Sequence, residues 1–214
     1  VAPRIAEIVM MGGAYFEVGN ITPAAEFNIY FDPEAAEIVF RSGIPIVQHP
    51  LDVTHGVLTT PERLERFRAI GNRTGVAVAE MLTFSQSFDL EKYGSEGAPL
   101  HDPCVTAWLL RPDLFIGRDV NVTIETGSAL TMGMTVADYW RVTDRPKNAH
   151  FVRSVEADGF YGLLVERLAR LDAAIAVARE VPVVVDRADA ADWIEAQGYT
   201  INTRFADALP STRS

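Results

Sequence analysis

The chain has 214 residues, 48% of them hydrophobic, so it can bury a sizeable core, and its length predicts one domain. Its 29 acidic and 19 basic residues give a net charge of −10, which argues against nucleic acid as a partner. No apolar run reaches the roughly eighteen residues of a membrane helix, and the single cysteine, Cys104, excludes an internal disulfide and a cysteine-based zinc site. We therefore expect a cytoplasmic protein that binds neither a membrane nor nucleic acid.

The first predicted element is a buried strand. Residues Ile8–Met11 form a short apolar run, and Gly12 and Gly13 end it. The polar residues that follow, as far as Asp32, predict one loop at the carboxyl end of this strand. Open α/β sheets bind their ligands at that end of their strands.

Three polar side chains in this loop are candidates for ligand binding. Asn20, Glu26 and Asn28 offer amide and carboxylate groups among small or apolar neighbours, which suits the binding of sugar hydroxyls. The alternative is that they are ordinary loop residues whose hydrogen bonds are satisfied within the loop. The residue types alone leave both interpretations open.

Helices and strands then alternate along the chain, as in a parallel sheet. A proline after a capping residue marks two helix starts, at Asp32-Pro33 and Thr60-Pro61. The predicted helices cover residues 33–41, 60–70, 75–88, 103–110 and 160–179, and the predicted parallel strands cover residues 44–47 and 150–155. Residues 120–136 predict an antiparallel hairpin. The fold class is therefore α/β, a mostly parallel sheet flanked by helices with an antiparallel hairpin.

Two other segments carry residues that could bind a ligand or a metal. His49, Asp52 and His55 follow the second strand, but their spacing fits no compact metal site and favours a structural turn. Residues 89–99 are rich in glycine, serine and charge and predict a mobile lid. Phe88 and Tyr93 could pack on a flat ligand face there, or belong to the core.

The segment His101-Asp102-Pro103 is the second candidate site. Pro103 stands where a helix begins, so Asp102 could be a plain cap of that helix. A carboxylate beside a histidine also suits a hard cation and a leaving group.

Several of these strings resemble the inosine-uridine preferring nucleoside hydrolase family, which cleaves the N-glycosidic bond of ribonucleosides. The strings are MGGA from Met11, GNITPAAEFN from Gly19, DPEAA from Asp32, PLDVTH from Pro50 and HDP from His101. The resemblance covers about residues 3–171. It implies hydrolysis of a nucleoside to ribose and free base, with calcium as cofactor.

The resemblance also implies roles for single residues. Asn20 and Glu26 would hold the 5′ end of the ribose and Asn28 its ring hydroxyls. His101 would contact or protonate the leaving base, and Asp102 would bind calcium and ribose. Met11, Phe88 and Tyr93 complete the implied substrate contacts.

The aspartate-rich motif of the family, of the DxDxGxDD kind, is absent from the sequence. We therefore expect that residues 1–171 are the carboxyl-terminal part of a nucleoside hydrolase-like domain, inactive alone, and that residues 172–214 are an unassigned extension. A homo-oligomer is expected. The alternative function is a non-catalytic sugar- or nucleoside-binding remnant, or a packing subunit without the metal site.

Overall fold

The computed structural model describes residues 4–93 and 96–178, and it describes no side chains for residues 87–93 and 172–178. Backbone contacts divide the chain into two units, Val1–Asp172 and Ala173–Ser214. The elements described below belong to the first unit, except for the end of the last helix. The sequence also predicts a strand at residues 181–185 and a short helix at residues 190–197, and both lie outside the described residues.

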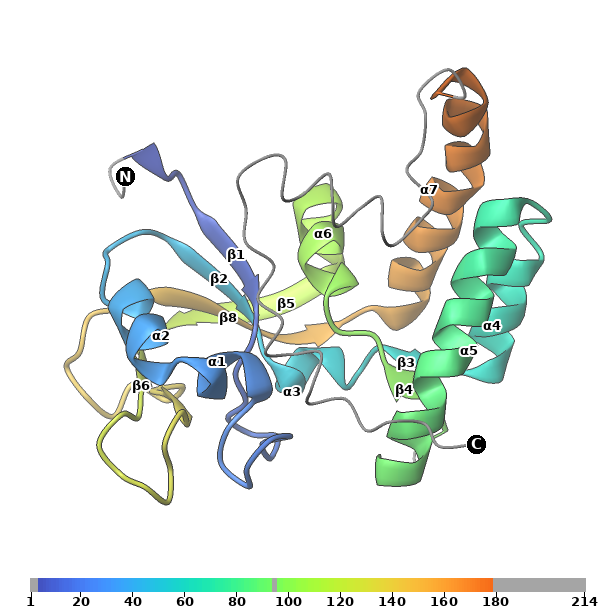
Figure 1. Ribbon diagram of the computed structural model, residues 1–214. Coiled ribbons are helices and arrows are strands. Elements are labelled where there is room, and N and C mark those ends of the chain that lie inside the picture. The colour runs from blue at the N-terminus through green and yellow to red at the C-terminus, as the bar shows by residue number, and fades with distance from the viewer. Residues whose placement is uncertain (1–3, 94–95, 179–214) are drawn as a thin grey trace, which may run out of the picture. The chain divides into compact units, whose positions relative to one another are not determined.

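The main sheet is mostly parallel, as predicted (Figure 1). The strands β1 and β8 both run parallel to β2, whereas β5 pairs antiparallel with β8. In order across the sheet, the strands are β1 (Ile8–Met11), β2 (Ile46–His49), β8 (Ala149–Val155) and β5 (Phe115–Val120). Because β1 and β2 pair from Ile8↔Ile46 to Met11↔His49, their carboxyl ends lie side by side.

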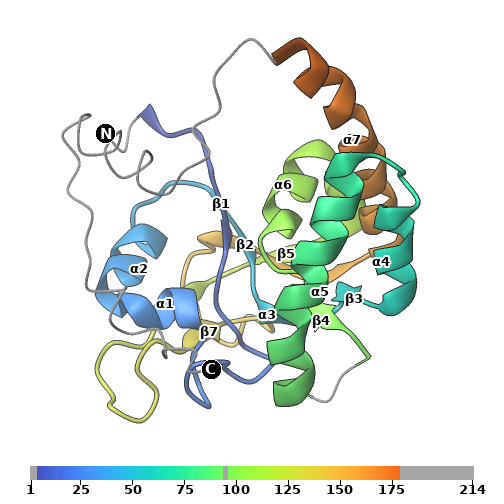
Figure 2. The ribbon, with the colours of Figure 1, turned by 45° about the vertical axis from the view of Figure 1, so that its right-hand side comes forward.

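Helices cover both faces of this sheet. Figures 1 and 2 show α1 and α2 on one side and α4, α5 and α6 on the other. The helices are α1 (Phe27–Phe31), α2 (Pro33–Phe40), α3 (Leu51–Thr54), α4 (Pro61–Arg68), α5 (Arg73–Tyr93), α6 (Pro103–Leu110) and α7 (Ala157–Ala178), with a 3-10 turn at Pro112–Leu114. None of the described helices is long and apolar enough to cross a membrane.

The core has one cluster on each face of the sheet. Ile46 and Val47 are neighbours on β2, and they point to opposite faces because side chains alternate along a strand. Ile46 packs with Phe40 of α2, and Val47 belongs to the cluster that includes Phe160 of α7. The sheet is therefore buried on both faces at β2, which explains why β2 has no exposed residue.

The predicted helix starts are confirmed. The Asp32 side chain accepts the Ala35 N–H at 2.9 Å and caps α2, and the Thr60 hydroxyl caps α4 in the same way. The loop predicted from Gly12 to Asp32 is wrong at its end, where Phe27–Phe31 forms α1. A helix of five residues is too short to show the regular spacing of apolar residues by which helices are recognised in a sequence. Its start depends on the Glu26 side-chain cap.

The antiparallel hairpin is confirmed, with a shift of its second strand. Strands β6 (Val122–Ile124) and β7 (Thr135–Ala137) pair antiparallel. Apolar residues also alternate at Leu130, Met132 and Met134, but these residues lie in the connecting turn. The Glu125 carboxylate stabilises that turn by accepting the Gly127 N–H.

Part of the predicted lid, residues 89–99, has regular secondary structure in the described backbone, and its role as a lid stays a prediction. Helix α5 continues to Tyr93, and β4 (Ala98–Pro99) pairs with β3 (Leu58–Thr59). Leucine, glutamate and lysine at positions 90–92 favour helix, so the charged composition does not end it.

Candidate active site

The turn after β1 is built on two glycines. Gly13 has φ of +87°, and a Cβ there would lie 2.4 Å from Gln48 Nε2 and 2.6 Å from Thr135 Oγ1. A residue other than glycine would therefore be strained in its backbone and would collide with two buried side chains. The Gly13 N–H donates to Glu26 Oε2 at 2.9 Å, and the Gly13 carbonyl accepts the Leu51 N–H at 2.8 Å.

Glu26 is the buried anchor of the loop. Only 2% of its surface is exposed, and its carboxylate also accepts the N–H groups of Asn28 at 2.9 Å and Ile29 at 3.3 Å, which caps α1. The two oxygens of a carboxylate can accept about four hydrogen bonds, and backbone N–H groups occupy three of these positions here. Glu26 thus has a structural role, with about one acceptor position left for a ligand hydroxyl.

The other predicted residues of the loop lie next to this anchor. Asn20 Oδ1 accepts the Phe27 N–H at 2.8 Å. Asn28 Nδ2 lies 3.4 Å from the carbonyl oxygen and 3.3 Å from the Sδ of Met11, at the end of β1. The structure therefore gathers Met11, Asn20, Glu26 and Asn28 around the carboxyl end of the first strand, as the sequence predicts.

His101 is held by residues of helix α3 and the turn that follows it. Helix α6 follows His101 directly and packs next to β1. His101 Nδ1 lies 2.7 Å from Thr54 Oγ1, and its ring centroid is 5.8 Å from that of His55. His55 Nδ1 in turn lies 3.4 Å from Glu17 Oε2. Sequence reasoning missed Thr54 and Glu17 in this arrangement, although Thr54 lies inside the PLDVTH string.

Asp102 does not cap α6. Its backbone is already in the helical region, with φ of −63° and ψ of −37°, and its side chain makes no capping hydrogen bond. The residue is exposed. The interpretation of Asp102 as a plain cap is therefore wrong, and its carboxylate is available to a ligand.

Asp52 has a structural role, as predicted for the turn after β2. Its carboxylate accepts three backbone N–H groups of the first loop, from Tyr15 at 3.0 Å, Phe16 at 2.7 Å and Glu17 at 3.3 Å. These bonds fasten the loop after β1 to helix α3, so the two loops at the strand ends form one structure.

His49 belongs to the core and not to a site. It is fully buried, with Trp108 and Phe115 packed edge-on against its ring. Burial lowers the pKa of His49 to about 4, so the ring is neutral at pH 7. Burial likewise raises the pKa of the Cys104 thiol to about 12, which makes it a poor nucleophile.

Only one described residue of this site, Asp102, suits a calcium ion as a ligand. Asp102 offers an exposed carboxylate, a ligand type that calcium prefers, but the described residues contain no group of three His, Cys, Asp or Glu side chains that could hold a metal. Phe88 and Tyr93 lie on α5 where side chains are not described, so their roles stay predictions.

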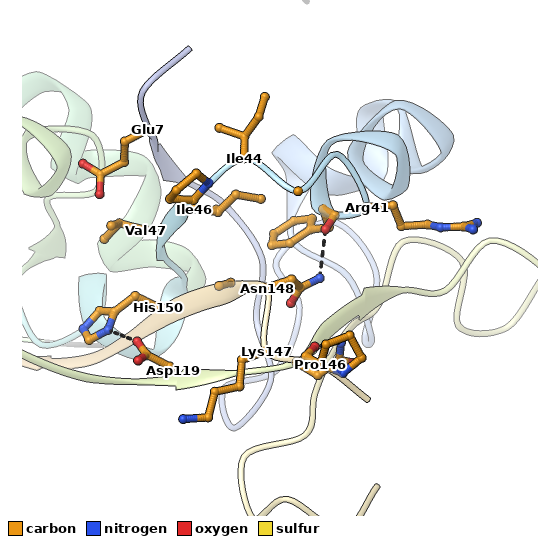
Figure 3. A pocket seen from close by; sticks show the side chains of 15 residues that line it. Glu7, Arg41, Ile44, Ile46, Val47, Asp119, Pro146, Lys147, Asn148 and His150 are labelled. Carbon is orange, nitrogen blue, oxygen red and sulfur yellow. Dashed lines mark hydrogen bonds and ion pairs between the residues drawn. The ribbon is translucent and has the colours of Figure 1, made fainter. Parts of the chain in front are cut away.

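A cavity of about 710 Å³ lies at the other end of the parallel strands. Figure 3 shows it between Glu7, Arg41 and His150, near the amino ends of β1 and β2. His150 Nδ1 is 2.7 Å from Asp119 Oδ1, so the imidazole and the carboxylate are hydrogen-bonded to each other. The cavity is not part of the site at the carboxyl ends.

Known proteins resemble this chain over most of its length. Residues 1–162 match the family model for inosine-uridine preferring nucleoside hydrolase. The pyrimidine-specific ribonucleoside hydrolase RihA of Shigella boydii is 55% identical over 166 residues, which cover 77% of this chain and 53% of that protein. A Schizosaccharomyces pombe protein is 56% identical over 171 residues, which cover 80% of this chain and 55% of that one.

Solved structures show the same fold. A purine-preferring ribonucleoside hydrolase from Gardnerella vaginalis matches with a TM-score of 0.69 and 31% identity, over 77% of this chain and 52% of that one. The plant nucleoside hydrolase PpNRh1 matches with a TM-score of 0.71 and 28% identity, over 78% of this chain and 55% of that one. The chain thus spans about half the length of the relatives it matches.

Proposed function

Because the chain belongs to the inosine-uridine preferring nucleoside hydrolase family, we propose that the protein it forms part of hydrolyses the N-glycosidic bond of ribonucleosides. Water adds to the anomeric carbon, the bond to the base nitrogen breaks, and the base leaves with a proton. The 55% identity to an enzyme described as pyrimidine-specific makes uridine and cytidine the first substrates to test.

The observation that carries this proposal is the exposed Asp102 carboxylate, which caps no helix. Because this carboxylate makes no capping bond, its oxygens can accept a ligand. It lies beside His101, whose ring is held by Thr54, and on a helix that packs next to β1. A metal ligand and a leaving-group acid would then be adjacent.

The residues of the first loop would bind the sugar. Glu26 has about one acceptor position left, enough for one ribose hydroxyl, and Asn20 would share the 5′ end with it. Asn28 would bind the ring hydroxyls with its exposed amide, next to Met11. A carboxylate near the sugar also stabilises the positive charge that develops as the glycosidic bond breaks.

His101 would give its proton to the departing base. A ring nitrogen of the base is a poor leaving group as an anion, and protonation lowers the barrier to its departure. Phe88 and Tyr93 would pack on the base. The general base that activates water is expected to be an aspartate outside these 214 residues.

Calcium completes the proposal as cofactor. When bound, it would supply a positive charge that holds the ribose diol and lowers the pKa of a water molecule. Asp102 would contribute one ligand, and the other ligands would come from outside the described residues.

A homo-oligomer in the cytoplasm is part of the same proposal. The edge position of β1, whose residues are all half-buried, supports association.

A second candidate is a non-catalytic nucleoside-binding remnant or packing subunit. The lack of metal ligands favours this candidate, because the described residues contain no cluster of side chains that could hold a calcium ion by themselves. Glu26 and Asn28 would bind ribose in either case.

Ribose release separates the two candidates. The 214-residue chain and a full-length enzyme that contains these residues are each incubated with uridine, cytidine and inosine, with calcium or with a chelator. We expect calcium-dependent ribose release from the full-length enzyme and none from the 214-residue chain. A full-length enzyme that binds ribose or nucleoside without hydrolysing it would establish the remnant instead.

A further inference from the structure

One buried side chain touches His101 without belonging to any assigned site. Thr54 is fully buried, and its hydroxyl oxygen lies 2.7 Å from His101 Nδ1. Most buried hydroxyls in a helix bond a carbonyl of the preceding turn, but the hydrogen bond described for this hydroxyl goes to an imidazole 47 residues away.

Thr54 is held rigidly. It ends helix α3, where its own N–H donates to the Pro50 carbonyl at 3.2 Å, and Leu51 at the start of α3 donates to Gly13 at 2.8 Å. Leu51 and Val53, which precede Thr54 in the same helix, are fully buried. The position of the Thr54 hydroxyl is therefore fixed relative to the turn at Gly13, which also binds the Glu26 carboxylate.

A hydroxyl suits this position because it can both donate and accept. As a donor to an unprotonated Nδ1, it would place the proton of the neutral ring on Nε2. As an acceptor, it could bond the Nδ1–H group of the imidazolium. A backbone carbonyl could only accept, and would force the proton of the neutral ring onto Nδ1.

We propose that Thr54 is a positioning residue that holds Nδ1 of His101 by this hydrogen bond and so assigns Nε2 as the nitrogen that meets the leaving base. This inference rests on the proposed function for its catalytic meaning. The proton balance is simple: the Nε2–H bond of the imidazolium breaks, an N–H or O–H bond forms on the base, and Nδ1–H stays bonded to Thr54.

Ring-nitrogen NMR of the full 214-residue chain tests the hydrogen bond without any activity. The chain has only four histidines, so ¹⁵N-histidine labelling gives four spin systems, and His101→Asn assigns the one of interest. We expect neutral His101 to carry its proton on Nε2, with Nδ1 shifted as a hydrogen-bonded acceptor. Thr54→Val should move Nδ1 toward the shift of an unbonded nitrogen, and Thr54→Ser should restore it. A neutral ring protonated on Nδ1, or a shift unchanged in Thr54→Val, would overturn the inference.

Thr59→Val is the matched control. Thr59 is also a buried threonine, and its hydroxyl lies 2.8 Å from the Tyr161 hydroxyl, away from His101. It should cost similar stability and leave the His101 signals in place. Among the described residues, the His55 ring lies 5.8 Å from the His101 ring and in turn contacts Glu17, so the comparison is made at one pH where His101 is neutral in every variant.

Kinetics of the full-length enzyme test the catalytic part. Thr54→Val should lower kcat for uridine on the order of tenfold, the effect of losing one hydrogen bond, with KM little changed. It should spare a p-nitrophenyl riboside, whose leaving group needs no proton, and Thr54→Ser should recover kcat. Equal losses on both substrates would contradict a role through His101. A wild-type enzyme without activity would instead overturn the proposed function, and the NMR result would still decide the hydrogen bond.

Discussion

The Gly13 N–H donates to the Glu26 carboxylate at 2.9 Å, while the carbonyl of the same Gly13 accepts the Leu51 N–H at 2.8 Å. One glycine therefore joins the loop after β1 to helix α3, which carries Thr54, the hydrogen-bond partner of His101. The two halves of the candidate site share this residue as their common support.

The first prediction concerns this support. Gly13→Ala should destabilise the chain by about 2 kcal/mol or more, because the new Cβ would lie 2.4 Å from Gln48 Nε2 and the φ of +87° is strained for alanine. Gly43→Ala is the control, since Gly43 has a similar φ of +77° with no atom within 4 Å of its Cβ position. It should cost only about 1 kcal/mol. Urea unfolding of both variants measures the difference, and equal losses would contradict the packing argument.

The second prediction concerns Glu26. Glu26→Gln replaces a carboxylate that accepts three backbone N–H groups by an amide with a single acceptor oxygen, so we expect a stability loss of about 1 to 3 kcal/mol. In a full-length enzyme it should also lower turnover of every nucleoside alike, by about 2 kcal/mol of barrier. Turnover is measured on uridine, cytidine and inosine at a temperature where the variant is folded. A loss confined to one base would argue against a sugar contact.

The third prediction separates a cap from a ligand. Asp102→Ala should change the unfolding free energy by less than about 0.5 kcal/mol, because Asp102 makes no capping bond. Asp32→Ala is the matched control, and it should cost about 1 kcal/mol because Asp32 caps α2 through the Ala35 N–H. In a full-length enzyme, Asp102→Ala should weaken calcium binding, measured by titration calorimetry. Unchanged calcium affinity and turnover would remove Asp102 from the metal site.

The fourth prediction assigns His101 by its choice of substrate. In a full-length enzyme, His101→Ala should strongly slow the hydrolysis of natural nucleosides, whose base needs a proton, and largely spare a p-nitrophenyl riboside. The ratio of kcat/KM for the two substrates is the measurement. If both substrates slow equally while calcium affinity is intact, His101 positions the substrate and is not the acid.

The fifth prediction is a pH dependence of stability. Unfolded His49 has its ordinary pKa of 6.5 and folded His49 a pKa of about 4, so the unfolded state binds more protons between these values. The contribution of His49 is complete above pH 6.5 and is lost as the pH falls toward 4. The stability lost at pH 5 amounts to about 2 kcal/mol. His49→Phe should flatten the fall in unfolding free energy between pH 7 and pH 5, and an equal slope in both proteins would refute it.

The sequence by itself determined the elements and motifs whose signals are local. The caps at Asp32 and Thr60, the apolar runs of β1 and β8, and the glycine pair after β1 act within a few residues of themselves. They therefore predict the α/β fold and a site at the carboxyl end of β1. The family strings determined the family for the same reason, since they are contiguous in the chain.

Only the tertiary structure decided what these side chains bind. The bonds from Gly13 to Glu26, from Thr54 to His101 and from the first loop to Asp52 join residues 13 to 47 positions apart, and their geometry depends on how β1, β2 and α6 pack. Strand β5 was missed for a similar reason, because the residues of β8 that pair with it, from Val120↔Ala149 to Phe115↔Val155, lie far later in the chain. The secondary-structure propensity of a residue does not depend on partners so far away in the chain. The two hydrogen bonds by which Gly13 links Glu26 to Leu51 therefore form only when the sheet is assembled.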